Sequence, residues 1–325
     1  MVRPRSSQPA PSSSNPASSE RGRPPERWGS ALSFVLAAAG SAVGLGNLWG
    51  FAYRASQGGG AAFVLLYVLI VALVCLPVLV AEMVLGRSTG HSPLLAPITA
   101  GGRRWAPLGW LFLAAAVGIL AYYAVLMGWT GLSLVEALLR ELPADMAAAQ
   151  AHFAGISSGG PAVLGQVLSM GLTGLVVAAG IRAGIERLTS WGVPLLFVLL
   201  LALAIWASFL PGAQEGYQGF LLRWDPSKLI DPTTIRNAFT QAFFSIGAGI
   251  GCILAYAAYL DQRSALPREA VSVVGLDTAV GLMAGCGSSP RLQRLLLLAL
   301  CWISSLAIAV GLAVSVTDLV RTWAR

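Results

Sequence analysis

Two glycine-rich interruptions in long apolar segments carry the clearest chemical signal in this sequence. The first reads AAAGSAVGLGNLWG and the second reads FFSIGAGIGC. Glycine destabilises a helix by about 1 kcal/mol relative to alanine, so both segments favour a local break. The carbonyl oxygens freed at a break suit a hard cation, and the amides that begin the next half-helix suit a carboxylate. A pair of such breaks points to the ion and substrate site of a transporter.

The same glycines have an alternative interpretation, which is close helix packing. Gly40 and Gly44 have the small-xxx-small spacing that lets two membrane helices approach each other. Gly46 lies near the middle of the first interruption, and Gly247, Gly249 and Gly251 lie at the middle of the second. Spacing alone leaves both interpretations open.

Polar side chains also interrupt the apolar segments. Glu82 and Asp277 are carboxylates within or at the ends of such segments. A charge at mid-membrane costs about 2.5–3.5 kcal/mol on insertion scales, so each carboxylate needs polar partners or a proton. Tyr123 lies in the middle of a segment, and Ser245 follows Phe244 at the second interruption. Taken singly, the tyrosine could be an interfacial aromatic, the serine could bond its own helix, and the phenylalanine could be core.

Membrane-spanning helices are the elements that must position these residues. Hydrophobic residues make up 56% of the 325 residues and charged residues only 11%, too few to build a water-facing surface. A helix needs about 20 apolar residues to cross the hydrocarbon core of a bilayer. The charge-free stretches of this length are 28–53, 55–81, 105–135, 153–181, 188–214, 237–260 and 295–317. With a shorter candidate at 270–286, the sequence predicts an all-α polytopic membrane protein of about eight transmembrane helices.

The net charge of +7 follows from membrane topology and does not require a nucleic-acid partner. With the N-terminus inside, two thirds of the 21 Lys and Arg residues fall on the cytoplasmic side, as is usual for membrane proteins. Residues 1–27 are rich in Pro and Ser and have no apolar period, so we expect a disordered cytoplasmic tail. We therefore expect an integral protein of the plasma (inner) membrane with a cytoplasmic N-terminus.

The sequence offers no credible catalytic group. We find no zinc-binding His–Glu motif, no nucleophile paired with a base and no ATP-binding P-loop. The four cysteines lie in or beside apolar segments without CxxC spacing, which is typical of buried hydrophobic residues. We therefore predict a protein that is not an enzyme and has no cofactor, and any transport must draw on an ion gradient.

The ordered motifs of this chain resemble the neurotransmitter:sodium symporter family. RWGSALSFVLAAAGSAVGLGNLWGFAY and GGGAAFVLLYVLIVALVCLPVLVAEMVLGR resemble its first two spans. AYYAVLMGW resembles span three, GIRAGIERLTSWGVPLLFVLLLAL spans four and five, AFTQAFFSIGAGIGCILAYAAYL span six and VVGLDTAVGLMAG the start of span seven. The resemblance runs from about Trp28 to Gly285 and implies a LeuT-type inverted-repeat fold. It also implies that sodium drives the inward movement of amino acids or amines.

The resemblance implies two sodium sites. The groups implied for the first ion are the carbonyl of Ala42 and the side chains of Asn47, Ser245 and Asp277. The second ion would take the carbonyls of Gly40 and Val43. Asp277 stands where the family has Asn or Asp, and a carboxylate there would bring its own negative charge to the cation. Chloride dependence stays open, because Gly281 lies where a serine or a glutamate would decide it.

The resemblance also implies a substrate site beside the first sodium ion. Its residues would be Leu45, Gly46, Tyr123, Phe244, Gly247 and Gly249. The amides of Leu45 and Gly46 and the Tyr123 hydroxyl would hold the substrate carboxylate, and the Phe244 ring would cover the substrate. Small residues at 247–249 favour a hydrophobic or aromatic amino acid, although the sequence does not identify it. Glu82 would brace the unwound part of span one without touching ion or substrate.

The chain departs from the family pattern at three positions of the first span. The family reads GNxWRFP after the first interruption, whereas this chain reads GNLWGFA. Gly50 thus replaces an arginine that helps close the outer gate, and Ala52 replaces a proline. Ala31 replaces a second arginine near the cytoplasmic end. The resemblance therefore implies weakened gates on both sides of the membrane.

The C-terminal part is the largest departure. Family members have eleven or twelve spans, whereas this chain has about eight, so we expect a complete first five-helix repeat and an incomplete second one. We divide the chain into the tail 1–27, a transmembrane domain 28–290 and a divergent hydrophobic segment 291–325 as a candidate eighth span. A frameshift after the codon of Gly285 would explain that segment. Alternatively, WISSLAIAV resembles the span-eight sodium motif, with Ser304 as a ligand and Ile303 in place of a threonine.

Two functions follow from this reading. The leading prediction is a sodium-coupled symporter that imports an amino acid or related small amine across the plasma membrane by alternating access. Its expected partners are sodium ions, the amino-acid substrate and membrane lipid, with no nucleic acid, and its oligomeric state stays open. The alternative is a truncated family member that does not transport, either regulatory or degenerate.

Overall fold

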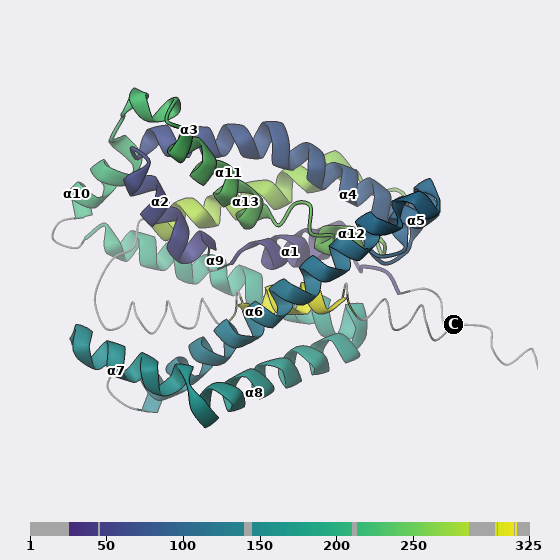
Figure 1. Ribbon diagram of the computed structural model, residues 1–325, viewed down its shortest axis with the longest axis horizontal. Coiled ribbons are helices and arrows are strands. Elements are labelled where there is room, and N and C mark those ends of the chain that lie inside the picture. The colour runs from purple at the N-terminus through teal and green to yellow at the C-terminus, as the bar shows by residue number, and fades with distance from the viewer. Residues whose placement is uncertain are drawn as a thin grey trace, which may run out of the picture.

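The regular secondary structure of the described residues is entirely helical (Figure 1). The computed structural model describes residues 26–44, 46–139, 145–209, 213–285, 303, 305–314 and 316. The all-α class predicted from the composition is therefore confirmed. The tail 1–25 and most of the segment 291–325 lie outside the described residues, so the predictions made for them are not addressed by the structure.

Four helices of the described residues are long and apolar enough to cross a membrane. They are Ala61–Thr89, Arg103–Leu139, Gly159–Ala178 and Ile181–Ala207. Within them lie α3 (Ala61–Ile70), α4 (Leu76–Thr89), α6 (Ala106–Leu139), α8 (Gly159–Ala178) and α9 (Arg187–Ala207). About 20 helical residues span the hydrocarbon core, so each of the four has sufficient length.

Of the four predicted spans outside this group, three differ for physical reasons, and the fourth, 295–317, lies partly outside the described residues. Two predicted spans are interrupted, so none of their pieces reaches the length of a spanning helix. A third, α13 (Leu266–Gly285), has sufficient length but carries Arg268, Glu269 and Asp277, which make it less apolar. The total number of spans stays a prediction.

The first interruption ends a helix and starts another. α1 (Ala31–Ala42) is capped by Ser30, whose side-chain oxygen accepts a hydrogen bond from the Ser33 amide at 3.0 Å. The helix stops directly before the cluster of glycines, where propensity is lowest. The chain resumes as a π-helical turn at Gly46–Gly50 and continues as α2 (Phe51–Gln57).

The second interruption separates α11 (Pro232–Ile246) from α12 (Cys252–Ala257). α11 begins with Asp231 as its cap and ends at Gly247, which has φ +66°. Gly249 and Gly251 also have positive φ values, +83° and +84°. Only glycine adopts this region at no steric cost, so the sequence GAGIG specifies the break.

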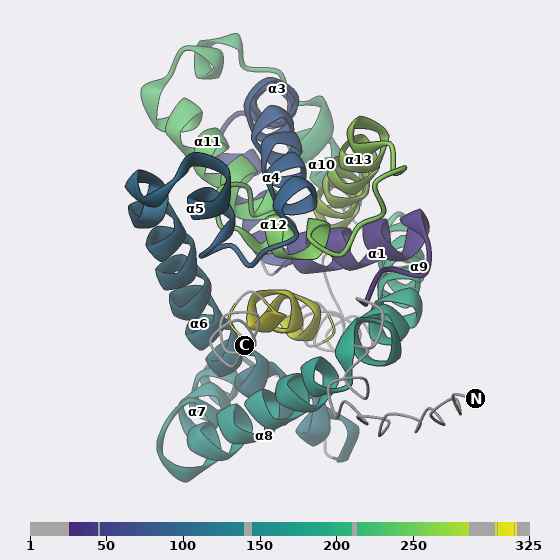
Figure 2. The ribbon, with the colours of Figure 1, turned by 90° about the vertical axis from the view of Figure 1, so that its right-hand side faces the viewer.

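The two broken helices lie at the centre of the molecule (Figure 2). α1 packs on α9 and α13, α11 packs on α3, and α12 packs on α4. α6 packs on α8 to one side, and the connecting segments include α5 (Ala96–Gly101), α7 (Met146–Ser157) and α10 (Ala213–Tyr217). A short buried helix at Ser305–Val314, yellow in Figure 2, lies between α1 and α8.

The start of α1 is tied to the start of α9. The Glu186 carboxylate accepts hydrogen bonds from the Gly29 amide at 3.0 Å and the Ser33 hydroxyl at 2.7 Å. A carboxylate at the N-terminus of α1 also interacts favourably with the positive end of the helix dipole. Arg27 forms an ion pair with Asp261 at 3.4 Å. These contacts hold the first half of the broken helix against its neighbours.

Candidate functional site

Asp277 of α13 and the three polar side chains around it form a buried cluster of four. Asn47 Nδ2 donates to Asp277 Oδ1 at 2.7 Å, and the Ser245 hydroxyl donates to Asp277 Oδ2 at 2.6 Å. The Tyr67 hydroxyl lies 3.2 Å from Ser245 Oγ and 3.5 Å from Asp277 Oδ2. Each of these four side chains is at most 1% exposed. Three of the side chains implied for the first sodium ion, from three separate elements, therefore meet at one point.

The cluster contains an oxygen that no protein donor satisfies. Within the described part of the chain, Asn47 Oδ1 is buried and has no hydrogen-bond partner. Buried polar atoms in folded proteins are nearly always paired, so an orphaned oxygen beside a carboxylate calls for an external partner. Hard cations prefer oxygen ligands, and an amide oxygen next to a carboxylate offers two of them. The arrangement fits a small cation.

Backbone oxygens are also available at the end of α1. The last four carbonyls of any helix lack an intrahelical partner, and Gly40 and Ala42 belong to the last turn of α1. The Gly44 carbonyl is occupied, since it accepts from the Asn47 and Leu48 amides at 3.0 and 3.1 Å. Leu45, expected to hold the substrate carboxylate, lies outside the described residues. Ala42 is thus the last residue of α1, and its role as a sodium ligand stays a prediction.

A small apolar cavity of about 40 Å³ adjoins the two breaks. Its lining includes Ala42, Tyr123, Phe244 and Gly247, which the sequence assigned to the ion or the substrate. The other lining residues are Ser41, Ile119, Ile246, Ile250, Cys252, Ile253, Ile308 and Leu312. Isoleucine and leucine side chains dominate this wall, so an apolar group is the best occupant by chemistry.

Two close approaches connect the cavity to the first break. A Cβ atom added at Gly44 would lie 2.6 Å from the Tyr123 hydroxyl, so this hydroxyl reaches the main chain of the break. A Cβ atom added at Gly46 would lie 2.5 Å from Cδ1 of Phe244, so the phenyl ring lies on Gly46. Phe244 is 46% exposed, as a ring over the mouth of a site would be. Gly249 faces open space, with nothing within 4 Å of an added Cβ.

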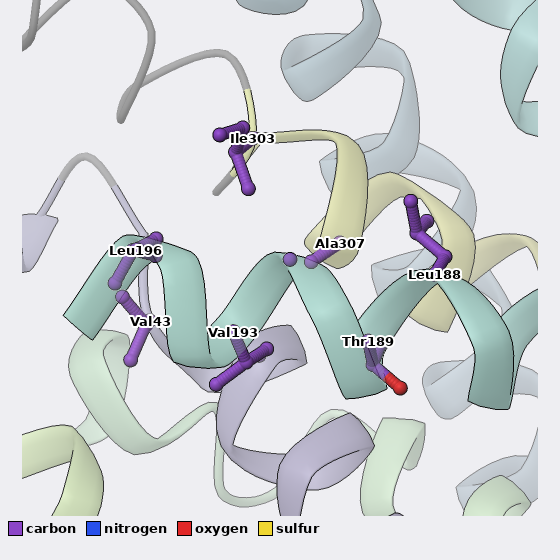
Figure 3. A pocket seen from close by; sticks show the side chains of 9 residues that line it. Val43, Leu188, Thr189, Val193, Leu196, Ile303 and Ala307 are labelled. Atoms are coloured by element: carbon purple, nitrogen blue, oxygen red, sulfur yellow. The ribbon is translucent and has the colours of Figure 1, made fainter. Parts of the chain in front are cut away.

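Gly40 and Val43, whose carbonyls are implied for a second sodium ion, line a different, smaller cavity, which Figure 3 shows from close by. It measures about 20 Å³ and is lined by Gly40, Val43, Leu188, Thr189, Gly192, Val193, Leu196, Ile303 and Ala307. The hydroxyl in that lining, from Thr189, already donates to the Ile185 carbonyl at 2.9 Å. Ile303 presents an alkyl side chain, and Ser304 lies outside the described residues. The second site therefore stays a prediction.

Glu82 braces the second break, whereas the sequence led us to expect the first. Its Oε1 accepts from the Gly249 amide at 2.9 Å and from the Gly251 amide at 3.2 Å. The difference arises because α4 packs on α12, which brings Glu82 to the start of α12. Consistent with the predicted supporting role, Glu82 satisfies two amides that the left-handed glycines leave without helical partners.

This contact makes Glu82→Leu a test of the second break. The leucine would leave the buried Gly251 amide and the more accessible Gly249 amide without their acceptor, at about 1–3 kcal/mol for a buried partner. We expect a clear fall in the melting temperature of the purified protein in detergent. Glu82→Gln retains an acceptor oxygen and is the matched control, with a smaller expected fall. Equal melting temperatures for Glu82→Leu and the unmodified protein would contradict the bracing role.

Two residues of the site were missed by the sequence analysis. Tyr67 completes the cluster around Asp277, and Gln241 reaches the first break, where its Nε2 donates to the Gly46 carbonyl at 3.2 Å. Tyr67 carries the only hydroxyl in the stretch 61–81, a signal that could have singled it out. Gln241 lies one helical turn before Ser245, on the same face of α11.

Comparison with known proteins gives a consistent match. The model of the sodium:neurotransmitter symporter family matches residues 25–155 and 148–288. The uncharacterized sodium-dependent transporter YhdH of Bacillus subtilis (strain 168) is 37% identical over 270 residues, which cover 82% of this chain and 59% of that protein. An uncharacterized sodium-dependent transporter of Methanocaldococcus jannaschii is 34% identical over 270 residues, covering 80% of this chain and 54% of that protein. The chain thus spans less than two thirds of these relatives.

A solved structure matches over most of the chain. The crystal structure of MhsT in complex with L-phenylalanine aligns with a TM-score of 0.81 and 34% sequence identity. The alignment covers 94% of this chain and 76% of MhsT. The similarity therefore extends over most of the helical arrangement described above.

Proposed function

Because the chain belongs to the sodium:neurotransmitter symporter family and has its LeuT-type fold, we propose that it is a sodium-coupled amino-acid symporter. In this proposal it resides in the plasma membrane with a cytoplasmic N-terminus, and sodium moving inward drives substrate uptake by alternating access. The family consists of transporters, which supports a function other than catalysis.

The observation that carries the proposal is the adjacency of the polar cluster and the apolar cavity. Asn47 contacts Asp277, while its neighbour Gly46 lies under the Phe244 ring. Ser245 likewise contacts Asp277, while Phe244 lines the cavity. In both pairs, one residue would face the ion and the residue directly before it would face the substrate. A cation bound at Asp277 would order the main chain of the two breaks. The substrate binds to the same main chain, so cation binding would strengthen substrate binding.

For the substrate we propose an apolar or aromatic L-amino acid. The cavity wall is built of aliphatic side chains, and the related MhsT has been solved in complex with L-phenylalanine. The substrate carboxylate would lie at the first break, near the Tyr123 hydroxyl and the amide of Gly46 that begins the second half-helix. Its side chain would project toward Phe244 and Gly247.

We further propose that transport does not need chloride. The Asp277 carboxylate is a fixed negative charge at the cation site, so the charge of the ion is balanced by the protein itself. Gly281 offers no side chain for an anion, and a Cβ there would contact the Phe51 ring at 3.7 Å. Replacing chloride by gluconate is expected to leave uptake unchanged.

Uptake into proteoliposomes tests the proposed function. Vesicles containing the full 325-residue chain would receive tritiated L-phenylalanine with an inward gradient of either sodium or potassium. We expect accumulation only with sodium, and its loss when a sodium ionophore collapses the gradient. Equal uptake with sodium and potassium would contradict sodium coupling, and no uptake alongside intact binding would favour a member that does not transport.

A further inference from the structure

Arg54 of α2 is a cation without a carboxylate partner. It lies one helical turn beyond Gly50, on the half of the first broken helix that follows the break. Its side chain is half-buried, and no carboxylate of the described residues lies within ion-pair distance of it. A half-buried guanidinium loses part of its hydration, so its hydrogen bonds must compensate. The group to which it donates is therefore informative.

The guanidinium is the outer end of a two-step hydrogen-bond relay. Arg54 Nη1 donates to Gln241 Oε1 at 2.9 Å, and Gln241 Nε2 donates to the Gly46 carbonyl at 3.2 Å. The Gln241 side chain is completely buried, so both ends of its amide need a partner. The relay thus fixes which way the Gln241 amide is turned, and the turned amide holds the carbonyl of Gly46.

Side chains at positions 50 and 54 can both reach Gln241 Oε1. They are four residues apart on one helix, a spacing that places side chains on the same face. A Cβ atom added at Gly50 would meet a single neighbour, Gln241 Oε1, at 3.8 Å. A side chain at position 50 would therefore have open space around it. It would start close to Gln241 Oε1, the atom to which Arg54 donates from one turn further along the helix.

We infer that Arg54 is a positioning residue for the substrate site, acting through Gln241 on the main chain of the first break. The inference rests on the proposed function and supplies a role for a side chain to which the family pattern gives none. Gly46 lies against the Phe244 ring and directly precedes Asn47. Holding the Gly46 carbonyl sets the direction of the half-helix whose first amides face the substrate carboxylate.

The relay also joins the outer halves of both broken helices. Arg54 and Gly46 belong to the half that follows the first break, and Gln241 belongs to α11, which precedes the second break. A closed substrate site requires these two halves to stay together. Because the Arg54–Gln241 bond is charge-assisted, it contributes more than a neutral hydrogen bond would. Losing it is therefore expected to weaken substrate binding without altering any residue that contacts the substrate.

The test measures equilibrium binding of tritiated L-phenylalanine in saturating sodium to four forms of the full chain. These are the unmodified protein, Arg54→Ala, Gln241→Leu, and the double variant. We expect Arg54→Ala to raise the dissociation constant about tenfold, the effect of one charged hydrogen bond. In the Gln241→Leu background, the same substitution should have almost no further effect, because the relay is already cut. Additive effects, or an unchanged dissociation constant for Arg54→Ala, would overturn the inference.

A relocated arginine separates positioning from a general structural role. In the double variant Gly50→Arg with Arg54→Ala, the new side chain starts 3.8 Å from Gln241 Oε1, and we expect it to restore most of the affinity. A purely local packing role at position 54 would not be rescued from position 50. If Arg54→Ala does not fold, Arg54→Gln replaces it throughout, since an amide lacks the charge.

The relay can also be tested without substrate. Melting temperatures of the same four proteins in detergent should show the same non-additivity between positions 54 and 241. Absence of L-phenylalanine binding by the unmodified protein would count against the proposed function alone. Additive shifts in melting temperature would count against the relay alone.

Discussion

Asp277→Asn is expected to weaken sodium-dependent binding of L-phenylalanine more than any other single substitution in the cluster. The substitution keeps the shape of the side chain but removes the negative charge at the centre of the cluster. It also places an amide NH₂ group where Asn47 Nδ2 or the Ser245 hydroxyl now donates, at 2.7 and 2.6 Å. Two donors then face each other in a completely buried position, and the cation loses its only charged ligand among the described residues of the cluster.

The expected effect is at least about a hundredfold rise in the sodium concentration that gives half-maximal binding, since charged hydrogen bonds are worth about 1.5–3 kcal/mol each. A sodium titration of tritiated L-phenylalanine binding measures it. Asp225→Asn is the matched control, because Asp225 is an exposed loop residue that contacts Ser227. If the Asp277→Asn protein kept the sodium dependence of the unmodified chain, sodium would have to bind at a site other than Asp277.

Gly44→Ala is the second substitution with a large expected effect. The new methyl group would lie 2.6 Å from the Tyr123 hydroxyl and 2.8 Å from Cδ1 of Ile308. Real Cβ atoms do not approach other atoms so closely, so the tyrosine or the main chain of the break must move. Both sides of the substrate carboxylate site would shift. We expect L-phenylalanine affinity to fall at least about tenfold, a loss of about 1.4 kcal/mol.

Removing the hydroxyl should relieve part of this conflict. In a Tyr123→Phe background, Gly44→Ala is therefore expected to reduce affinity by a smaller factor than in the unmodified protein. Gly118→Ala serves as the control, because no atom lies within 4 Å of an added Cβ at this position of α6. If Gly44→Ala bound L-phenylalanine as tightly as the Gly118→Ala control, the proposed contact between Tyr123 and the break would be wrong.

The glycine-rich stretches indicated two places where the central helices could stop, while their spacing alone left close helix packing as an alternative. α1 ends at Ala42 and α11 at Ile246, each directly before the glycine-rich stretch. The reason is local: glycine propensity is low, and the left-handed φ values after Ile246 are accessible to few other residues. The resemblance then brought Asn47, Ser245 and Asp277 to one place, where the structure also has them.

The sequence could not predict which side chains reach those places from neighbouring helices. Tyr67 and Glu82 lie on one continuous helical segment, yet one contacts the cluster at Asp277 and the other the start of α12. The hydrophobic pattern of a fully apolar helix has no polar face, so it does not reveal the rotation of the helix. The contact between Arg54 and Gln241 depends on packing between two separate helices, so the sequence alone did not predict it either.

The most direct test of the account is whether sodium and L-phenylalanine strengthen each other's binding. The claim is that both ligands order the same backbone, through Gly46–Asn47 and Phe244–Ser245. Radioactive ²²Na⁺ binding with and without L-phenylalanine, and L-phenylalanine binding with sodium or potassium, measure the coupling in both directions. The account predicts the same factor in both, at about tenfold or more, because binding linkage is reciprocal. L-Phenylalanine binding that is equally tight in sodium and potassium would contradict it.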